Sequence, residues 1–188
     1  MLFTKCERID SGDFVSRAGL LQKGFREVEE LVTWYRQPGF FRYSGVRKAR
    51  LKDIFRCMTI ARESFSYDRR HWDKRYPDWL ADLSKVWAVA RGFFNPASTV
   101  FVVDLEGVLG FLIGAREMSG SRIDLIAVDS RCRRQGAGDN LVAKAMDYYA
   151  RQGCIYIVAG TQTHNTASCK FYESLGFQII QRQRTFHK

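Results

Sequence analysis

Residues 123–142 read IDLIAVDSRCRRQGAGDNLV: an apolar run, a basic turn with two glycines, and the start of an amphipathic pattern. The apolar run predicts a strand that ends at Val128, and the pattern after Gly138 predicts a helix. Gly136 and Gly138 let the backbone curl without Cβ clashes, so that successive N–H groups are exposed at the helix N-terminus. Because the helix dipole also favours an anion there, this stretch predicts a phosphate-binding turn.

The neighbouring residues narrow the ligand of this turn. Arg131, Arg133 and Arg134 add cationic side chains that suit further phosphate charge. The turn has no Gly-Lys-Ser/Thr for a nucleoside triphosphate and no Gly-x-Gly-x-x-Gly for a dinucleotide. An isolated Gly-x-Gly is usually a solvated helix N-terminus, but the order of the flanking elements favours a pyrophosphate site here.

Patterns in the rest of the chain predict an α/β fold. Strands are expected within residues 28–34, 46–49, 100–103, 108–114, 123–128, 154–159 and 177–182, and helices within 14–22, 54–61, 77–91, 138–152 and 165–174. Pro38-Gly39 interrupts the chain, so we expect residues 1–43 to form a small N-terminal α/β appendage and residues 44–188 the main domain. A helix, a glycine cap and an aromatic strand entry occur at 21–25 and again at 173–177, as a common joint or as a duplicated half-unit.

Composition excludes several classes of protein. The 188 residues carry 30 Lys+Arg against 20 Asp+Glu, a net charge of +10, which favours anionic partners. No apolar stretch approaches the roughly 20 residues of a membrane span, and the charged N-terminus excludes a secretory signal, so a cytoplasmic protein is expected. The five cysteines and three histidines are scattered, which predicts neither a disulfide framework nor a metal site.

Several ordered motifs together resemble the GCN5-related N-acetyltransferases. Arg133-x-x-Gly136-x-Gly138 after a strand is similar to that family's signature, and Ile126–Asp129 before it and Asn165–Ala167 and Phe171–Phe177 after it also match. The resemblance covers about residues 45–188. It implies the acetyltransferase fold with a mixed sheet, acetyl-CoA as cosubstrate, no metal, and a coenzyme arm inserted where two neighbouring strands splay apart.

The resemblance also implies roles for individual residues. The coenzyme is expected to contact Ile126, Ala127, Val128, Arg133, Arg134, Gln135, Gly136, Ala137, Gly138, Asp139 and Asn165. Tyr172 follows Asn165 by seven residues and is expected to protonate the departing thiolate, because a phenol with a pKa near 10 is close to a thiol. An ordinary half-buried helix tyrosine is the alternative reading of Tyr172.

The pattern leaves the general base open. Gly160 stands where many members of the family carry a glutamate, and Arg122 stands at another common base position. We therefore expect Asp124, on the same strand as Arg122, to accept the amine proton, with Glu117 or a chain of waters as alternatives. Asp139 is unusual beside a phosphate, but the first turn of a helix tolerates a carboxylate.

A closer resemblance concerns the acceptor. Stretches at 20–25, 64–76, 87–92 and 161–167 are similar to enzymes like dTDP-fucosamine acetyltransferase, which acetylate the amino group of a nucleotide-linked deoxysugar. The segment 67–76 supplies the cations and aromatics that a sugar nucleotide needs, so Tyr67, Arg69 and Arg70, with Arg122, are the expected substrate contacts. Core aromatics with a solvated cationic face explain the same segment equally well.

Two other functions remain open from the sequence. A protein N-terminus or a lysine could accept the acetyl group, since much of the core pattern matches protein acetyltransferases equally well. A nucleic-acid-binding module using the cationic aromatic segment is a more distant alternative, because no recognition helix or RNA-binding signature is present. A homodimer is possible.

Overall fold

The computed structural model describes residues 5–64 and 78–188 of the chain. Its strands are β1 (Cys6–Asp10), β2 (Arg26–Arg36), β3 (Val46–Lys48), β4 (Ser98–Asp104), β5 (Val108–Arg116), β6 (Ser121–Val128), β7 (Ile157–Gln162) and β8 (Gln178–His187). Its helices are α1 (Phe14–Gln22), α2 (Ile54–Ser64), α4 (Asp78–Phe94), α5 (Ala137–Arg151) and α6 (Thr166–Ser174), with short 3-10 turns at Leu51–Asp53 and Ser130–Cys132.

The eight strands form one sheet in the order β1-β8-β2-β7-β6-β5-β4-β3. Strands β6 and β7 pair in parallel and the other neighbours are antiparallel. A mixed sheet with helices is the architecture that the sequence predicts, and that prediction is confirmed.

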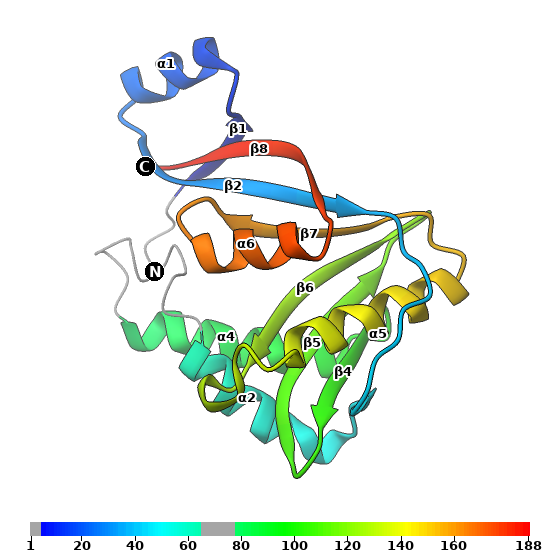
Figure 1. Cartoon of the computed structure of the whole chain (residues 1–188). Coiled ribbons are helices and arrows are strands. Elements are labelled where there is room, and N and C mark those ends of the chain that lie inside the picture. Colours follow the sequence, from blue (N-terminus) through cyan, green and yellow to red (C-terminus); the bar gives the residue numbers. More distant parts are fainter. Residues whose placement is uncertain (1–4, 65–77) are drawn as a thin grey trace.

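Helices cover both faces of the sheet. Because side chains alternate along a strand, Phe101 and Val103 of β4 join a core cluster with α5 and α6, whereas Val100 and Val102 join a second cluster with α2 and α4. Figure 1 shows α5 crossing in front of β4 and β5, with α4 behind them. Each fully buried Leu, Ile or Phe in these clusters contributes roughly 1.5–3 kcal/mol relative to an exposed position.

The N-terminal strand β2 lies inside the sheet. It pairs with β7 over Leu31–Arg36 and with β8 over Arg26–Tyr35, although β8 is the last strand of the chain. Strand β1 then pairs with the far edge of β8 (Figure 1). A division of the chain at residues 43 and 44 stays a prediction, but the sheet itself continues across that point.

The two similar joints in the sequence have the same hydrogen bonds. Gly24 follows the C-cap residue of α1 and Gly176 that of α6, with φ of 80° and 73°, a conformation in which glycine has no Cβ penalty. The next residue closes the cap in each case, since Phe25 N donates to Leu20 O and Phe177 N to Tyr172 O, both at 3.0 Å. Both phenylalanines are buried, so each joint fixes the start of a strand.

The structure contains the predicted helices and strands, but the ends of some of them differ from the predicted ends. The apolar run from Cys154 suggests a strand at 154–159, but β7 covers Ile157–Gln162. Residues before it are engaged elsewhere, because Cys154 N donates to Tyr149 O and Ile155 N to Ser119 O. In the described part of the chain, no helix is both long and apolar enough to cross a membrane.

Candidate functional site

Strands β6 and β7 diverge after a short paired stretch. They pair only at Ser121–Ile123 against Ile157–Ala159. Beyond this point each strand stays bonded to its outer neighbour, β6 to β5 and β7 to β2, so the two strands move apart (Figure 1). Backbone groups of β6 up to Val128 consequently face an opening, which is where the sequence resemblance places the coenzyme arm.

A β-bulge sits at the point of divergence. Ile113 pairs with Leu125 and Gly114 with Ile123, so Asp124 is an extra residue with no partner on β5. A bulge of this kind bends the strand and re-aims a side chain. Asp124 is thereby one of the residues that line the opening.

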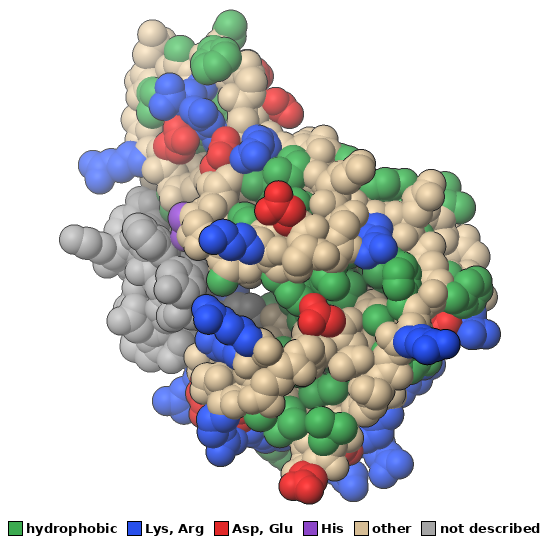
Figure 2. All heavy atoms as spheres, in the orientation of Figure 1, with side chains coloured by type: hydrophobic (Ala, Val, Ile, Leu, Met, Phe, Trp, Pro, Cys, Tyr) green, Lys and Arg blue, Asp and Glu red, His purple; other side chains and the backbone are tan. Residues whose placement is uncertain are grey.

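The opening is a cavity of about 180 Å³. Its lining comes from α2, α4, β6, β7 and α6: Ser64, Lys85, Ile123, Asp124, Leu125, Ile126, Gly160, Thr161, Gln162, Asn165, Ser168 and Tyr172. Figure 2 shows a hollow in this face of the molecule, between the region of α6 and the turn before α5, with Lys and Arg side chains on its rims. The structure therefore brings together four predicted residues: Asp124, Ile126, Asn165 and Tyr172.

Tyr172 lies at the wall of this cavity and is otherwise enclosed by aromatic rings. Its ring centroid is 6.2 Å from that of Trp34 and 5.3 Å from those of Phe171 and Phe177. Burial raises the pKa of the Tyr172 phenol above its ordinary value. The hydroxyl consequently stays protonated at neutral pH and can act as a donor.

Asn165 is the N-cap of α6. Its side-chain oxygen accepts a hydrogen bond from Ser168 N at 3.1 Å, which fixes the amide at the cavity wall. With the oxygen engaged, the amide nitrogen is the atom through which this side chain can donate to a ligand.

The candidate base belongs to an ion-pair cluster. Arg122 Nε donates to Asp124 Oδ1 and Arg122 Nη1 to Glu117 Oε1, both at 2.5 Å. The guanidinium is thus held between the two carboxylates that the sequence offers as bases, and Arg122 is not among the described residues that line the cavity. A substrate contact through Arg122 stays a prediction.

Gly160 has no side chain that could act as a base. A Cβ built at this position meets nothing within 4 Å. The strand position at which the resemblance would place a glutamate is therefore open space at the edge of the cavity.

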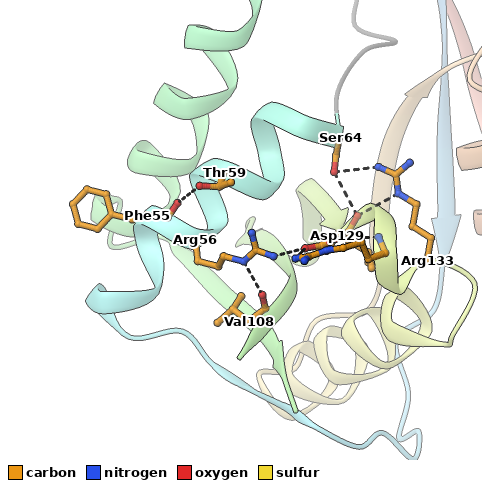
Figure 3. Close-up of polar contacts among 9 residues, drawn as sticks. Phe55, Arg56, Thr59, Ser64, Val108, Asp129 and Arg133 are labelled. Carbon is orange, nitrogen blue, oxygen red and sulfur yellow. Dashed lines mark hydrogen bonds and ion pairs between the residues drawn. The ribbon is translucent and has the colours of Figure 1, made fainter. Parts of the chain in front are cut away.

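The turn before α5 begins at a buried carboxylate. Asp129 is 1% exposed and accepts from Arg131 N and Arg131 Nη2, at 3.0 and 2.8 Å, and from Arg56 of α2. Arg56 also donates to Val108 O at 3.1 Å (Figure 3). Bonds from Arg131, followed by those from Arg56, hold the pKa of the Asp129 carboxyl well below its usual range.

Two residues of the turn itself have a positive φ. Arg134 has φ of 60°, which no other described non-glycine residue shares in sign, and Gly136 has φ of 78°. Gly136 is the N-cap of α5. It has no side chain, so no N-cap side chain accepts a hydrogen bond from the first N–H groups of α5. A Cβ at Gly138 would lie 3.1 Å from the Phe171 ring, so glycine permits the close approach of α5 and α6.

Arg133 lies differently from the expected phosphate contact. It donates from Nε to Val128 O at 3.3 Å and from Nη2 to Ser64 Oγ at 3.2 Å, as Figure 3 shows. The side chain thus connects the end of β6 to the end of α2, and a coenzyme contact by Arg133 stays a prediction.

Three predicted substrate contacts, Tyr67, Arg69 and Arg70, lie outside the described residues.

The sequence analysis did not identify Lys85 of α4 as a residue of the site. It lies four positions before the fully buried Val89 and so shares the inward face of that helix. A lysine at that spacing is the signal that could have been noticed.

Comparisons with known proteins agree with this geometry. The model of the acetyltransferase (GNAT) family matches residues 50–177. The uncharacterized N-acetyltransferase MJ1530 of Methanocaldococcus jannaschii is 27% identical over 135 residues, 71% of this chain and 77% of that protein. The spore coat polysaccharide biosynthesis protein SpsD of Bacillus subtilis is 27% identical over 131 residues, 68% of this chain and 45% of its own length.

A shorter match involves the human N-alpha-acetyltransferase 30, which is 44% identical over 64 residues, 34% of this chain and 17% of that protein. The chain therefore spans less than half of two of these relatives.

Solved structures share the fold. The GCN5-related N-acetyltransferase from Sphaerobacter thermophilus superposes with a TM-score of 0.70 at 16% identity, covering 98% of this chain and 59% of that one. The PaiA N-acetyltransferase from Thermoplasma acidophilum, solved in complex with coenzyme A, has a TM-score of 0.59 at 14% identity, covering 74% and 96%. Since the family model spans most of the sequence and includes both the turn and the diverging strands, the chain belongs to the acetyltransferase (GNAT) family.

Proposed function

We propose that this protein transfers the acetyl group of acetyl-CoA to a primary amine, and that the amine belongs to a nucleotide-linked deoxysugar. One observation carries the proposal: Asp124, Ile126, Asn165 and Tyr172 line a single cavity at the divergence of β6 and β7. That cavity has a hydrogen-bond donor for a leaving sulfur and a carboxylate for an incoming amine.

The turn before α5 fits a coenzyme pyrophosphate. Positive φ at Arg134 and Gly136 and the absence of a side-chain cap on α5 support backbone N–H donation by residues 134–139. Backbone groups of Ile126–Val128 and the Asn165 amide would hold the pantetheine arm. Acetyl-CoA supplies the thioester from which the acetyl group is taken.

The chemistry needs three proton transfers. Asp124 first accepts the proton that the ammonium must lose, directly or through water, and the neutral amine then forms a C–N bond to the acetyl carbon while the C–S bond breaks and the electron pair leaves with sulfur. Tyr172 donates its phenolic proton to that sulfur, and the nitrogen, which is cationic after acylation, returns one proton to the phenolate, directly or through water. The hydrogen bond from Arg122 Nε to Asp124 Oδ1 orients the carboxylate for this role.

The acceptor is expected to carry an anionic group. Lys85 lines the same cavity as Asp124, so a cation and a carboxylate face the acceptor side. Gly160 leaves space beside them for a bulky acceptor such as a sugar. The net charge of +10 and the likeness to a polysaccharide biosynthesis protein also support a phosphorylated sugar.

A peptide amine is the second candidate. The match to an N-alpha-acetyltransferase favours it, since 64 residues are 44% identical there, against 27% over the longer match to the polysaccharide biosynthesis protein. An acidic peptide would suit Lys85 as well as a phosphate does. Cytoplasmic location and a homodimer stay predictions of the sequence.

Thiol release from acetyl-CoA tests both candidates. The panel contains an amino-sugar nucleotide, the same amino sugar without its nucleotide, and peptides with acidic or basic N-terminal residues. We expect the highest kcat/KM with the nucleotide-linked amine and a large loss when the nucleotide is removed. Preference for a peptide would replace the sugar assignment, and no thiol release with any amine would contradict acetyl transfer altogether.

A further inference from the structure

Helix α6, which carries Tyr172 and follows Asn165, lies against a strand from the other end of the chain. It connects β7 to β8, and β2 occupies the place between these two strands. Strand β2 therefore lies close to the helix, and Figure 1 shows it running alongside β7 and α6.

Strand β2 bonds to the chain on either side of α6. In the turn before the helix, Thr163 donates from its backbone N and from Oγ1 to Glu30 O, at 2.9 and 3.4 Å. At the other end, the Arg36 guanidinium donates to Leu175 O, the C-cap residue of α6, and lies 4.7 Å from the Phe41 ring.

The separation of these two contacts exceeds the length of the helix. The six residue steps from Glu30 to Arg36 span about 20 Å along β2. Helix α6 has nine residues, which span about 13 Å. One strand is consequently long enough to contact the chain on either side of α6.

Trp34 lies between these two contacts and packs against Tyr172. It is 5% exposed, and its ring plane makes 29° with that of Tyr172 at 6.2 Å between centroids. Among the described residues, its buried Nε1 has no hydrogen-bond partner. A buried donor without a partner destabilises a fold, so an indole at this position calls for an explanation beyond packing.

We propose that Trp34 is a positioning residue for Tyr172, held in place by the bonds of β2 to the chain on either side of α6, so that the N-terminal segment is part of the catalytic unit. The inference rests on the proposed acid role of Tyr172. Trp34 takes no part in bond making; it limits the rotation of the phenol and keeps water from it.

A double-mutant cycle tests this directly. Trp34→Phe should lower kcat at least tenfold in the unmutated protein and leave acetyl-CoA affinity within twofold. In a Tyr172→Phe background the same change should have no further effect on kcat, because a positioning residue acts only through the group that it positions. Equal losses in both backgrounds would show a purely structural role and overturn the proposal.

Tyr35→Leu is the matched control. Tyr35 is the next residue of β2, and its ring contacts Tyr156 at 6.4 Å rather than α6. A general weakening of β2 should lower the activity of both variants. A loss confined to Trp34 supports positioning.

The titration of Tyr172 gives a readout that does not depend on turnover. Trp34→Ala should admit water and lower the pKa of Tyr172 toward that of an exposed tyrosine, with Trp34→Phe in between. The charged groups of the facing elements, Asp124 on β6 and Lys85 on α4, are unchanged in these variants. The difference absorbance between each variant and its Tyr172→Phe counterpart measures this pKa.

The two readouts separate the possible failures. If no amine is acetylated, the proposed function fails, yet an altered Tyr172 titration in Trp34→Phe still supports the contact. If acetylation occurs but neither kcat nor the titration changes in Trp34→Phe, the positioning role is wrong. Should Trp34→Ala not fold, Trp34→Phe alone decides.

Discussion

The two sides of the cavity are built in different ways. The proposed coenzyme turn, residues 129–138, owes most of its shape to neighbours in sequence: Asp129 binds Arg131, and Gly136 begins α5, with Arg56 of α2 as a distant partner of Asp129. The proposed catalytic helix α6 and the turn before it contact Glu30, Trp34 and Arg36, which lie more than 130 residues earlier. A motif of contiguous residues can be recognised from sequence, whereas a helix fixed by a distant strand cannot, because its contacts depend on sheet order.

The coenzyme turn should be the side at which one substitution does the most damage. Gly136→Asp forces a non-glycine residue to φ of 78° and places a negative charge where phosphate is expected. In the unmutated protein, acetyl-CoA at a hundredfold excess over Kd should stabilise the fold by about 2.7 kcal/mol. We expect this shift in melting temperature, and all activity, to be lost in Gly136→Asp.

Gly153→Asp is the control for backbone strain. Gly153 has φ of 74° and follows the opposite end of α5, with no atom within 4 Å of a built Cβ. Its variant should be destabilised to a similar degree and still respond to acetyl-CoA. Loss of the response in both would mean that strain, and not the phosphate site, is being measured.

The catalytic side should respond next most strongly. Tyr172→Phe removes one hydroxyl and is expected to lower kcat by about 10²–10⁴ while acetyl-CoA affinity is retained. Burial raises the pKa of Tyr172, so the acid form persists in the unmutated protein until the pH exceeds the range of an exposed tyrosine. Any fall in kcat should therefore begin only at a pH well above the value of about 10 for an exposed tyrosine, and it should disappear in the Phe variant.

Tyr149→Phe sharpens that result. Tyr149 is also fully buried, and burial likewise raises the pKa of its phenol, but it lies on α5 and is not part of the cavity lining. The variant should keep kcat. Equal kcat for Tyr172→Phe and the unmutated enzyme across the pH range would reduce Tyr172 to a packing residue.

A smaller effect should separate the two carboxylates of the ion-pair cluster. Asp124→Asn is expected to lower kcat by about 10², at the lower end of general-base contributions. Glu117→Gln removes the other carboxylate on Arg122 but leaves the cavity lining intact, so its kcat should stay near that of the unmutated enzyme. The reverse order would make Glu117 the base.

The smallest expected effect concerns the stability of the coenzyme turn. Because the pKa of Asp129 is lowered in the folded state, its contribution is present above the unfolded value of about 3.9 and is lost as the pH falls below it. Asp129→Asn should therefore melt at a lower temperature than the unmutated protein at neutral pH. The difference between the two melting temperatures should shrink progressively as the pH falls below that unfolded value, and a constant difference would contradict the ion-pair account.

Much of the fold could be predicted because its patterns are local. Helix α1 begins and ends where the sequence indicates, and the order of strand, turn and helix around Gly136 is confirmed. Strand β1 was missed, because it is only five residues long and largely polar. On α4, Trp87 is 68% exposed whereas Val89 is fully buried, so hydrophobicity by itself does not indicate which face of this helix is buried.

The candidate site shows the same division between local and distant information. Asn165 and Tyr172 were predicted from the family resemblance, which includes their spacing, and both line the cavity. Lys85 and Trp34 were not predicted, because nothing in the sequence shows that α4 and β2 pack near α6. Arg122 and Asp124 are two residues apart on a strand and so share a face, but their pairing was not predicted.

The sequence alone determined the glycine turn before α5, the capping of α6 and the α/β succession, because these depend on glycine conformations, hydrogen bonds between near neighbours and the period of apolar residues. The tertiary structure alone decided that β2 lies between β7 and β8. Sheet order is selected by the burial of whole strands against distant partners, and that free energy is recorded in no single segment. The environment of Tyr172 therefore emerges only when both ends of the chain meet in one sheet.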